Sequence, residues 1–187
     1  MSRELDVARL ELPRDEKGFV RRECPACGRT FKTRPSRYDA RAVHRRLASL
    51  FPFENAHESG DSEGPPWCCL YCGHKAPTDS WLTTEQHVHV ERVARAWANH
   101  VRYEQLAHVT RTLSQNPRPT FVVVPPEDLP GPMPPDSESL RVIPMVCCGE
   151  DVQALWEWDS ALYCPRCGAH HGGLSGRQQI HLRFIQE

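Results

Sequence analysis

Cys24-Pro25-Ala26-Cys27-Gly28 is the first of three short stretches that share one pattern; the others are Cys69-Leu70-Tyr71-Cys72-Gly73 and Cys164-Pro165-Arg166-Cys167-Gly168. Each stretch has two cysteines separated by two residues and a glycine directly after the second cysteine. Two side chains across such a turn can reach one metal ion, and glycine accepts the positive φ that lets backbone amides approach the sulfurs. Three copies in one chain indicate metal-binding knuckles rather than unrelated buried thiols.

We expect the knuckles to form two four-cysteine sites, because structural zinc takes four ligands. The first two knuckles predict metal site 1. The third has only Cys147-Cys148-Gly149 as a partner, in which Met145 stands where the first cysteine would be. His170 or His171 can replace Cys147 as the fourth ligand. The sequence therefore predicts two structural Zn²⁺ ions, with site 1 formed by Cys24, Cys27, Cys69 and Cys72 and site 2 by Cys147, Cys148, Cys164 and Cys167.

Cys68 is the ninth cysteine and is not needed by either site. Its neighbour Trp67 favours a small, buried, apolar thiol, which is the usual state of a free cysteine. The alternatives are a further metal ligand or a redox-active thiol.

The overall composition fits a small protein that needs metal to fold. The chain has 187 residues, of which 39% are hydrophobic and 17 are proline. Such a chain builds only small cores. It has no apolar run of the roughly 20 residues that a membrane span needs, and its first residues do not resemble a signal peptide. We expect a cytoplasmic protein with reduced cysteines and no membrane contact.

The order of segments predicts a small, metal-stabilised α+β fold. Two zinc ribbons, each made of short antiparallel β-hairpins, are expected to flank a long α-helix. The helix is predicted because Thr83 to Ser114 contains neither proline nor glycine, and Thr83 with Gln86 fits a capping box. The expected units are an N-terminal ribbon (1–82) with an inserted basic helix (about 36–51) and an acidic loop (54–66), the long helix (83–116), a strand at 119–124 with a proline-rich linker (117–139), and a C-terminal ribbon (140–187).

The knuckles CPACG, CLYCGH and CPRCGAHH resemble those of zinc ribbons, which are rubredoxin-like. The layout is similar to that of uncharacterised bacterial proteins with paired zinc ribbons around a helical segment. The resemblance covers around 70 residues, and the unit from about 143 to 171 matches best in form. It implies the fold and the metal, and it implies no activity.

The sequence favours a protein-interaction module over an enzyme. It contains no HExxH zinc motif, P-loop, dinucleotide-binding glycine pattern or nucleophile elbow. We therefore expect no catalytic residue and no small-molecule substrate. The predicted helix is too long for its ribbons to cover, and Trp156 and Trp158 are expected on one face of a strand. Both features favour an adaptor that docks a protein partner.

An arginine-rich segment supports an alternative function. Residues 17–46 carry ten basic and two acidic side chains, a net charge of +8. Arg34, Arg37, Arg41 and Arg45 recur at helical spacing and can follow a phosphate backbone, which predicts nucleic-acid binding. The same arginines can instead pair with the acidic loop. A third hypothesis is that the protein is a redox sensor based on a thiol or on zinc.

Overall fold

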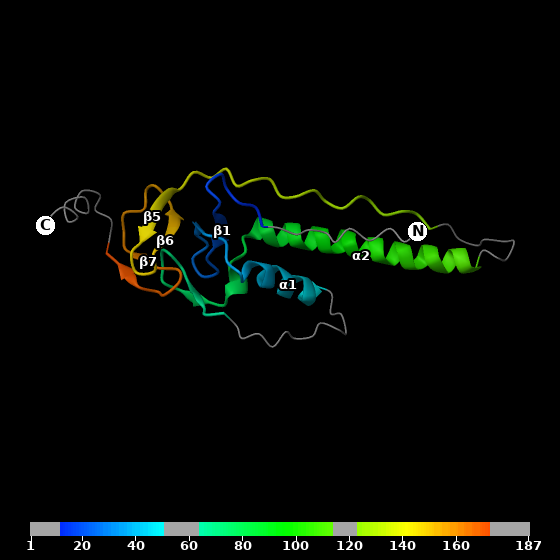
Figure 1. Ribbon diagram of the computed structural model, residues 1–187, viewed down its shortest axis with the longest axis horizontal. Coiled ribbons are helices and arrows are strands. Elements are labelled where there is room, and N and C mark those ends of the chain that lie inside the picture. Colours follow the sequence, from blue (N-terminus) through cyan, green and yellow to red (C-terminus); the bar gives the residue numbers. More distant parts are fainter. Residues whose placement is uncertain (1–11, 51–63, 114–122, 173–187) are drawn as a thin grey trace.

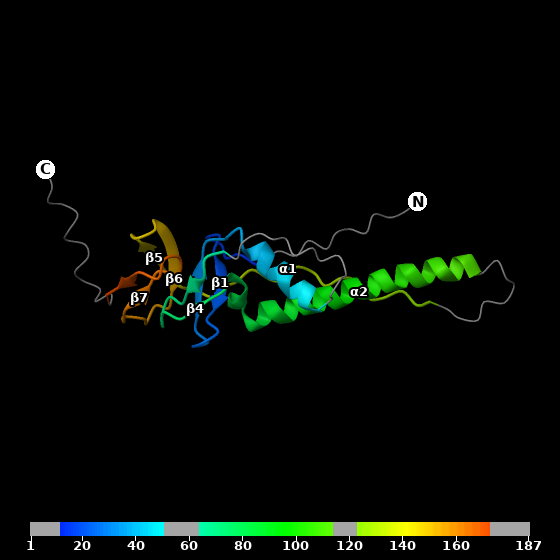
Figure 2. The same cartoon turned by 90° about the horizontal axis from the view of Figure 1, so that it is seen from below.

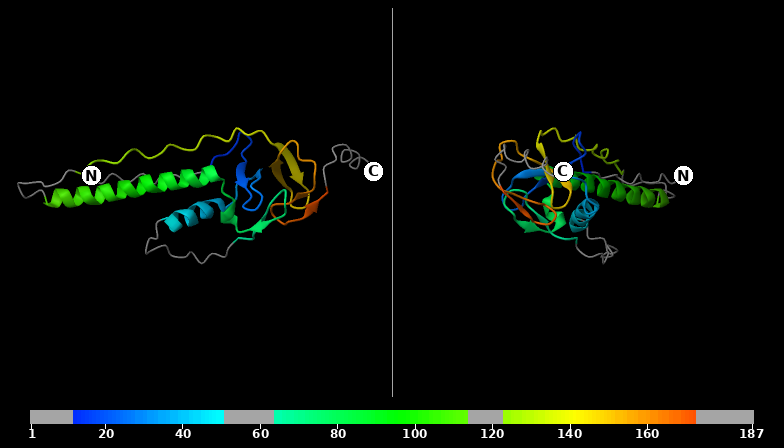
Figure 3. Two further views of the ribbon diagram at one scale, coloured as in Figure 1. Left: turned by 180° about the vertical axis from the view of Figure 1, so that it is seen from behind. Right: turned by 60° about the vertical axis from the view of Figure 1, so that its left-hand side comes forward.

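The computed structural model describes residues 12–50, 64–113 and 123–172. It is a small α+β structure of short antiparallel strands and one long helix, as the sequence predicts. The strands gather at one end, from which α2 projects with the proline-rich segment alongside it (Figures 1 and 3). In chain order the elements are β1 (Val20–Glu23), β2 (Thr30–Thr33), α1 (Asp39–Leu50), β3 (Trp67–Cys68), β4 (Lys75–Ala76), the 3-10 turn η1 (Thr78–Trp81), α2 (Thr84–Leu113), β5 (Arg141–Met145), β6 (Glu150–Ala154), β7 (Leu162–Tyr163) and β8 (His170–His171).

The largest sheet joins the two predicted ribbons. It has four strands in the order β1-β2-β6-β5, and every neighbouring pair is antiparallel. Strand β2 of the first ribbon pairs with β6 of the second, with Lys32 opposite Gln153 and Thr33 opposite Val152. The ribbons therefore flank α2 along the chain but lie side by side in space. Hairpins β3–β4 and β7–β8 form separate two-stranded sheets.

One hydrophobic core serves both ribbons. Phe31 on β2 is fully buried and meets Tyr71 and Trp81 edge-on, with ring centroids 6.2 and 5.9 Å apart. The Tyr71 hydroxyl donates to the Thr30 carbonyl at 2.9 Å and accepts the Leu155 N–H at 3.1 Å. Tyr71 lies in the second knuckle, so this side chain links a metal-binding turn to strands of both ribbons.

The opposite face of the sheet carries a buried lysine. Lys32 donates to the Glu138 carbonyl at 2.6 Å and lies 3.3 and 3.4 Å from the carboxylates of Asp15 and Asp136. Gln153, across from Lys32, also donates to Asp15 at 2.9 Å. The proline-rich segment is thus anchored to the sheet at its C-terminal end. Its described part, 123–139, has no helix or strand, so the predicted strand at 119–124 is not formed at 123–124, and 119–122 lie outside the described residues.

The predicted capping box starts α2. The Thr83 N–H donates to Gln86 Oε1 at 2.9 Å, and the Gln86 N–H donates to Thr83 Oγ1 at 3.2 Å. The predicted basic helix is α1, which packs against the first half of α2 (Figure 2). Neither described helix is both long and apolar enough to cross a membrane.

The prediction for the two C-terminal tryptophans is wrong. Strand β6 ends at Ala154, so Trp156 and Trp158 lie in a turn rather than on one strand face. Trp156 is 62% exposed, whereas the Trp158 ring packs 4.8 Å from the Tyr71 ring and its indole N–H donates to the Ala161 carbonyl. The Trp158 backbone N–H donates to the Leu155 carbonyl at 3.2 Å, and the Trp158 indole packs against the core.

Candidate metal centres

The three complete knuckles share one backbone geometry. In each, the glycine N–H donates to the carbonyl of the first cysteine, and the first cysteine's own N–H donates to a carbonyl beyond the glycine. The glycines have φ values of 67°, 70° and 72°, in the region that residues with a Cβ disfavour. The glycine bonds are Gly28 to Cys24 at 2.9 Å, Gly73 to Cys69 at 3.1 Å and Gly168 to Cys164 at 2.8 Å.

The structure brings together the four cysteines of metal site 1. The sulfurs of Cys24, Cys27, Cys69 and Cys72 all lie within 4.8 Å of one another. Cys24 and Cys72 are 3.7 Å apart and Cys27 and Cys69 are 3.8 Å apart. A tetrahedron with metal–sulfur bonds of about 2.3 Å has edges of about 3.8 Å. The donor set therefore fits a metal ion such as zinc.

Site 1 combines protected and partly accessible sulfurs. Cys24 and Cys69 are buried, and the Ala26 and Cys27 N–H groups approach Cys24 Sγ at 3.4 and 3.5 Å. Burial raises the pKa of Cys69. Burial also acts to raise the pKa of Cys27, but hydrogen bonds from the Arg29 backbone and neighbouring thiols lower it to about 7. The lowered pKa favours the thiolate of Cys27, the form that binds metal.

Metal site 2 is also assembled, from one complete and one incomplete knuckle. Its four sulfurs lie within 4.8 Å of one another, and Cys147 and Cys167 are 3.6 Å apart. The Met145 carbonyl accepts the N–H groups of Cys148 and Gly149 at 3.2 and 2.8 Å. Met145 thus holds the backbone place of the first cysteine, as the register predicts. Its side chain is only 2% exposed and belongs to the core.

The two histidines near site 2 are placed differently. His171 Nε2 lies 3.2 Å from Cys147 Sγ. His170 is exposed, and its ring packs 5.1 Å from the Tyr163 ring. Of the two alternatives to Cys147, His171 is therefore adjacent to the site.

Site 2 faces solvent more than site 1 does. Cys147, Cys148 and Cys167 are exposed, and only Cys164 is buried. A hydrogen bond from the Ala169 backbone, followed by contacts with the other thiols, lowers the pKa of Cys167 to about 7. Burial and the neighbouring thiols raise the pKa of Cys147 to about 12. The thiolate form is thus favoured at Cys167 and disfavoured at Cys147.

Cys68 lies between the two sites and belongs to neither tetrad. It is buried, and its thiol donates to the Gly73 carbonyl at 3.2 Å. Burial raises its pKa; the Lys75 charge opposes this effect, and the charges of Cys72 of site 1 and of Cys164 and Cys167 of site 2 add to it. The Cys68 N–H donates to the Pro165 carbonyl at 2.9 Å, so the second and third knuckles are in direct contact.

The four arginines at helical spacing each contact another side chain of the chain. Arg34 lies 3.6 Å from the Asp151 carboxylate, and Arg45 lies 2.5 Å from that of Asp79. The Arg37 and Arg41 guanidinium groups lie over the Tyr38 ring at 4.9 and 5.6 Å. The expected acidic partner, 54–66, is outside the described residues except for 64–66. Asp79 and Asp151 are distant in sequence, and no sequence signal pointed to them.

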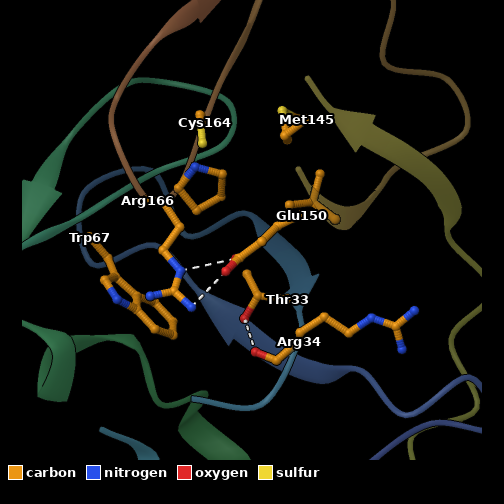
Figure 4. Close-up of a pocket in the computed structure, with 9 residues that line it drawn as sticks. Thr33, Arg34, Trp67, Met145, Glu150, Cys164 and Arg166 are labelled. Atoms are coloured by element: carbon orange, nitrogen blue, oxygen red, sulfur yellow. Dashed lines mark hydrogen bonds and ion pairs between the residues drawn. The ribbon is translucent and has the colours of Figure 1, made fainter. Parts of the chain in front are cut away.

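A small cavity lies between site 2 and the four-stranded sheet (Figure 4). Its lining includes Trp67, Met145 and Cys164. The Arg166 guanidinium and the Glu150 carboxylate beside it form two contacts, at 3.0 and 2.7 Å. The cavity volume is about 10 Å³, room for about one water molecule.

Comparison of this chain with known protein families, with characterised proteins and with solved structures finds no match.

Proposed function

We propose that this protein is a non-enzymatic, zinc-stabilised interaction module that docks a protein partner on the exposed side chains of the second half of α2. The observation that supports this proposal is the exposure of the α2 side chains. The helix has 30 residues, a length of about 45 Å. Among its described side chains, none beyond Ala94 is buried. Leu106 and Val109 are 56% and 48% exposed, and side chains three apart lie on one helix face.

The chemistry of the two sites supports a structural role for the metal. Both tetrads consist of cysteines, and four thiolates complete a tetrahedral shell without leaving a position for water or substrate. Zinc is the metal we assign, because tetrahedral thiolate sites suit it. The metal would then hold the ribbons together and so fix the base from which α2 projects.

The experiment compares three versions of the protein by crosslinking in its own cells, followed by mass spectrometry. The test variant is Leu106→Glu with Val109→Glu. The control is Gln105→Glu with Thr112→Glu, which adds the same charge at exposed polar positions of the same helix. We expect one discrete partner to crosslink to the wild type and the control, and at least tenfold less to the test variant. Identical crosslinks in all three proteins, or no partner in any, would reject the proposal.

Nucleic-acid binding is the second candidate. The observation in its favour is that two guanidinium groups, from Arg37 and Arg41, share a surface with the Tyr38 ring. Against it, Arg34 and Arg45 lie beside carboxylates. Gel retardation decides between the candidates: the alternative requires salt-dependent binding that weakens in Arg37→Ala/Arg41→Ala/Arg45→Ala. If the wild-type protein retards no nucleic acid at low salt, the nucleic-acid-binding hypothesis is rejected.

A further inference from the structure

Site 2 has four cysteine donors within 4.8 Å of one another and a histidine nitrogen beside one of them. This fifth donor is His171 Nε2, 3.2 Å from Cys147 Sγ. A tetrahedral zinc ion takes four ligands, and imidazole is as ordinary a ligand as thiolate. One donor must therefore remain outside the coordination shell at any time.

Cys147 is the one cysteine of site 2 that does not stand at a first or second ligand position of a knuckle. In a complete knuckle the first cysteine begins the turn, and its sulfur accepts N–H groups from the turn, as Cys24 does from Ala26 and Cys27. In site 2 that place belongs to Met145, whose side chain is buried in the core. Cys147 reaches the site from the third position of the turn and is exposed.

His171 comes from the part of site 2 that carries the complete knuckle. It lies on β8, where it pairs with Leu162 on β7. Strands β7 and β8 enclose the complete knuckle, which carries Cys164 and Cys167. The imidazole is thus held by the same hairpin as two of the cysteines, independently of the Cys147 turn.

We propose that the fourth position of site 2 exchanges between Cys147 and His171, and that Cys147 is consequently a site of covalent modification by soft carbon electrophiles. With His171 as the ligand, Cys147 is a solvent-facing sulfur. The thiol gives its proton to solvent, and its sulfur forms a carbon–sulfur bond with a probe such as iodoacetamide as iodide leaves. Cys148, Cys164, Cys167 and His171 remain to hold the metal.

Metal content per chain tests the exchange. We expect two ions in the wild type, in Cys147→Ser and in His171→Ala, but one in the double variant Cys147→Ser/His171→Ala. Cys147→Ser/His170→Ala is the matched control, because His170 is the exposed neighbour that packs on Tyr163. This control should keep two ions. A drop to one ion in Cys147→Ser alone, or two ions in the double variant, overturns the proposal. If the wild type binds only one ion, site 2 does not bind metal and the proposal of exchange fails. That result would not affect the docking role proposed for α2.

Alkylation of the metal-loaded protein tests the modification. We expect iodoacetamide to label Cys147 before Cys148 and Cys167, because the bound metal occupies the other two sulfurs, although all three are exposed and the pKa of Cys147 is raised. In the wild type the label should release no metal, whereas in His171→Ala it should release one ion per labelled chain. Peptide mapping and a chromogenic chelator give the two readings. Earlier labelling of Cys148 or Cys167, or equal metal release from both proteins, contradicts the exchange.

Discussion

At the scale of single residues, the buried charges are tied to named partners. Arg22 on β1 is 1% exposed, donates to Asp39 Oδ1 at 2.7 Å and to Thr33 Oγ1 at 3.2 Å, and lies 4.6 Å over the Trp67 ring. Burial lowers the pKa of Arg22, and the Asp39 charge opposes this effect. The pair connects the sheet to the first turn of α1.

Removal of the Asp39 carboxylate should therefore destabilise the folded protein. We expect Asp39→Ala to lower the free energy of unfolding by about 3 kcal/mol, because it leaves a buried guanidinium without its counter-charge. Urea unfolding of the metal-loaded protein measures the change. The double variant Arg22→Met/Asp39→Ala should recover part of the loss, since it removes both charges. A loss below about 1 kcal/mol for Asp39→Ala would show that water reaches Arg22.

Asp15 should make the protein sensitive to acid. Burial acts to raise its pKa, but hydrogen bonds from the Phe19 N–H, Gln153 and Lys32, together with the Lys32 charge, hold it below the ordinary value of 3.8. A carboxylate with a lowered folded-state pKa stabilises the fold above its unfolded-state pKa, and this contribution is lost as the pH falls through the folded-state value. We expect Asp15→Asn to be less stable than the wild type near neutral pH, with the difference narrowing between about pH 5 and pH 2. Thermal unfolding of both proteins across that range measures the difference. A difference that does not change with pH would contradict it.

At the scale of elements, the sequence predicts local features such as helix caps and turns, but it does not predict which distant strands pair. The Thr83–Gln86 box marks the start of α2 because the two residues satisfy each other's backbone N–H groups within one turn. The shared turn geometry likewise places Met145 in the first-cysteine position. By contrast, β2 pairs with β6 across more than a hundred residues, and β2 alone carries no sign of this partner. Strand β6 likewise ends before the tryptophans, and Trp158 packs on Tyr71, a partner distant in the sequence.

The buried Lys32 gives a test of how the proline-rich segment is held. We expect Lys32→Met to speed cleavage by a glutamate-specific protease after Glu138 at least tenfold, because Glu138 and Asp136 lose the ammonium group that anchors them. Cleavage after Glu127 should change little, since Glu127 lies far from Lys32 in the segment.

Lys17→Met is the matched control, because Lys17 is exposed and its replacement leaves the buried pairs intact. Mass spectrometry of the fragments gives both rates. Equal rates after Glu138 in the wild type and Lys32→Met would show that other contacts, such as the ion pair of Arg21 with Glu138 at 3.3 Å, suffice to hold the segment.

At the scale of the whole molecule, the two metal sites form one assembly. Knuckle spacing in the sequence pointed to both tetrads, yet it gave no reason to expect them in contact. In the structure the sheet, the core and the Cys68–Pro165 hydrogen bond join the ribbons. Metal at one site should therefore stabilise the other, because both depend on the same folded core.

Metal removal should accordingly proceed in two coupled steps. We expect a chelator to take the site 2 ion first, because three of its four cysteines are exposed, and the site 1 ion later, because Cys24 and Cys69 are buried. Cys164→Ser, which removes the one buried donor of site 2, should weaken metal binding at site 1 about tenfold, a coupling free energy of about 1.4 kcal/mol. Metal competition titrations measure the affinity, and tryptophan emission reports the environment of the buried Trp81. Lys17→Met is a suitable control, since Lys17 is exposed and supplies no metal ligand. If site 1 keeps its wild-type affinity in Cys164→Ser, the ribbons are energetically independent despite their shared sheet, and the contacts of Cys68 and Tyr71 carry no coupling between the sites.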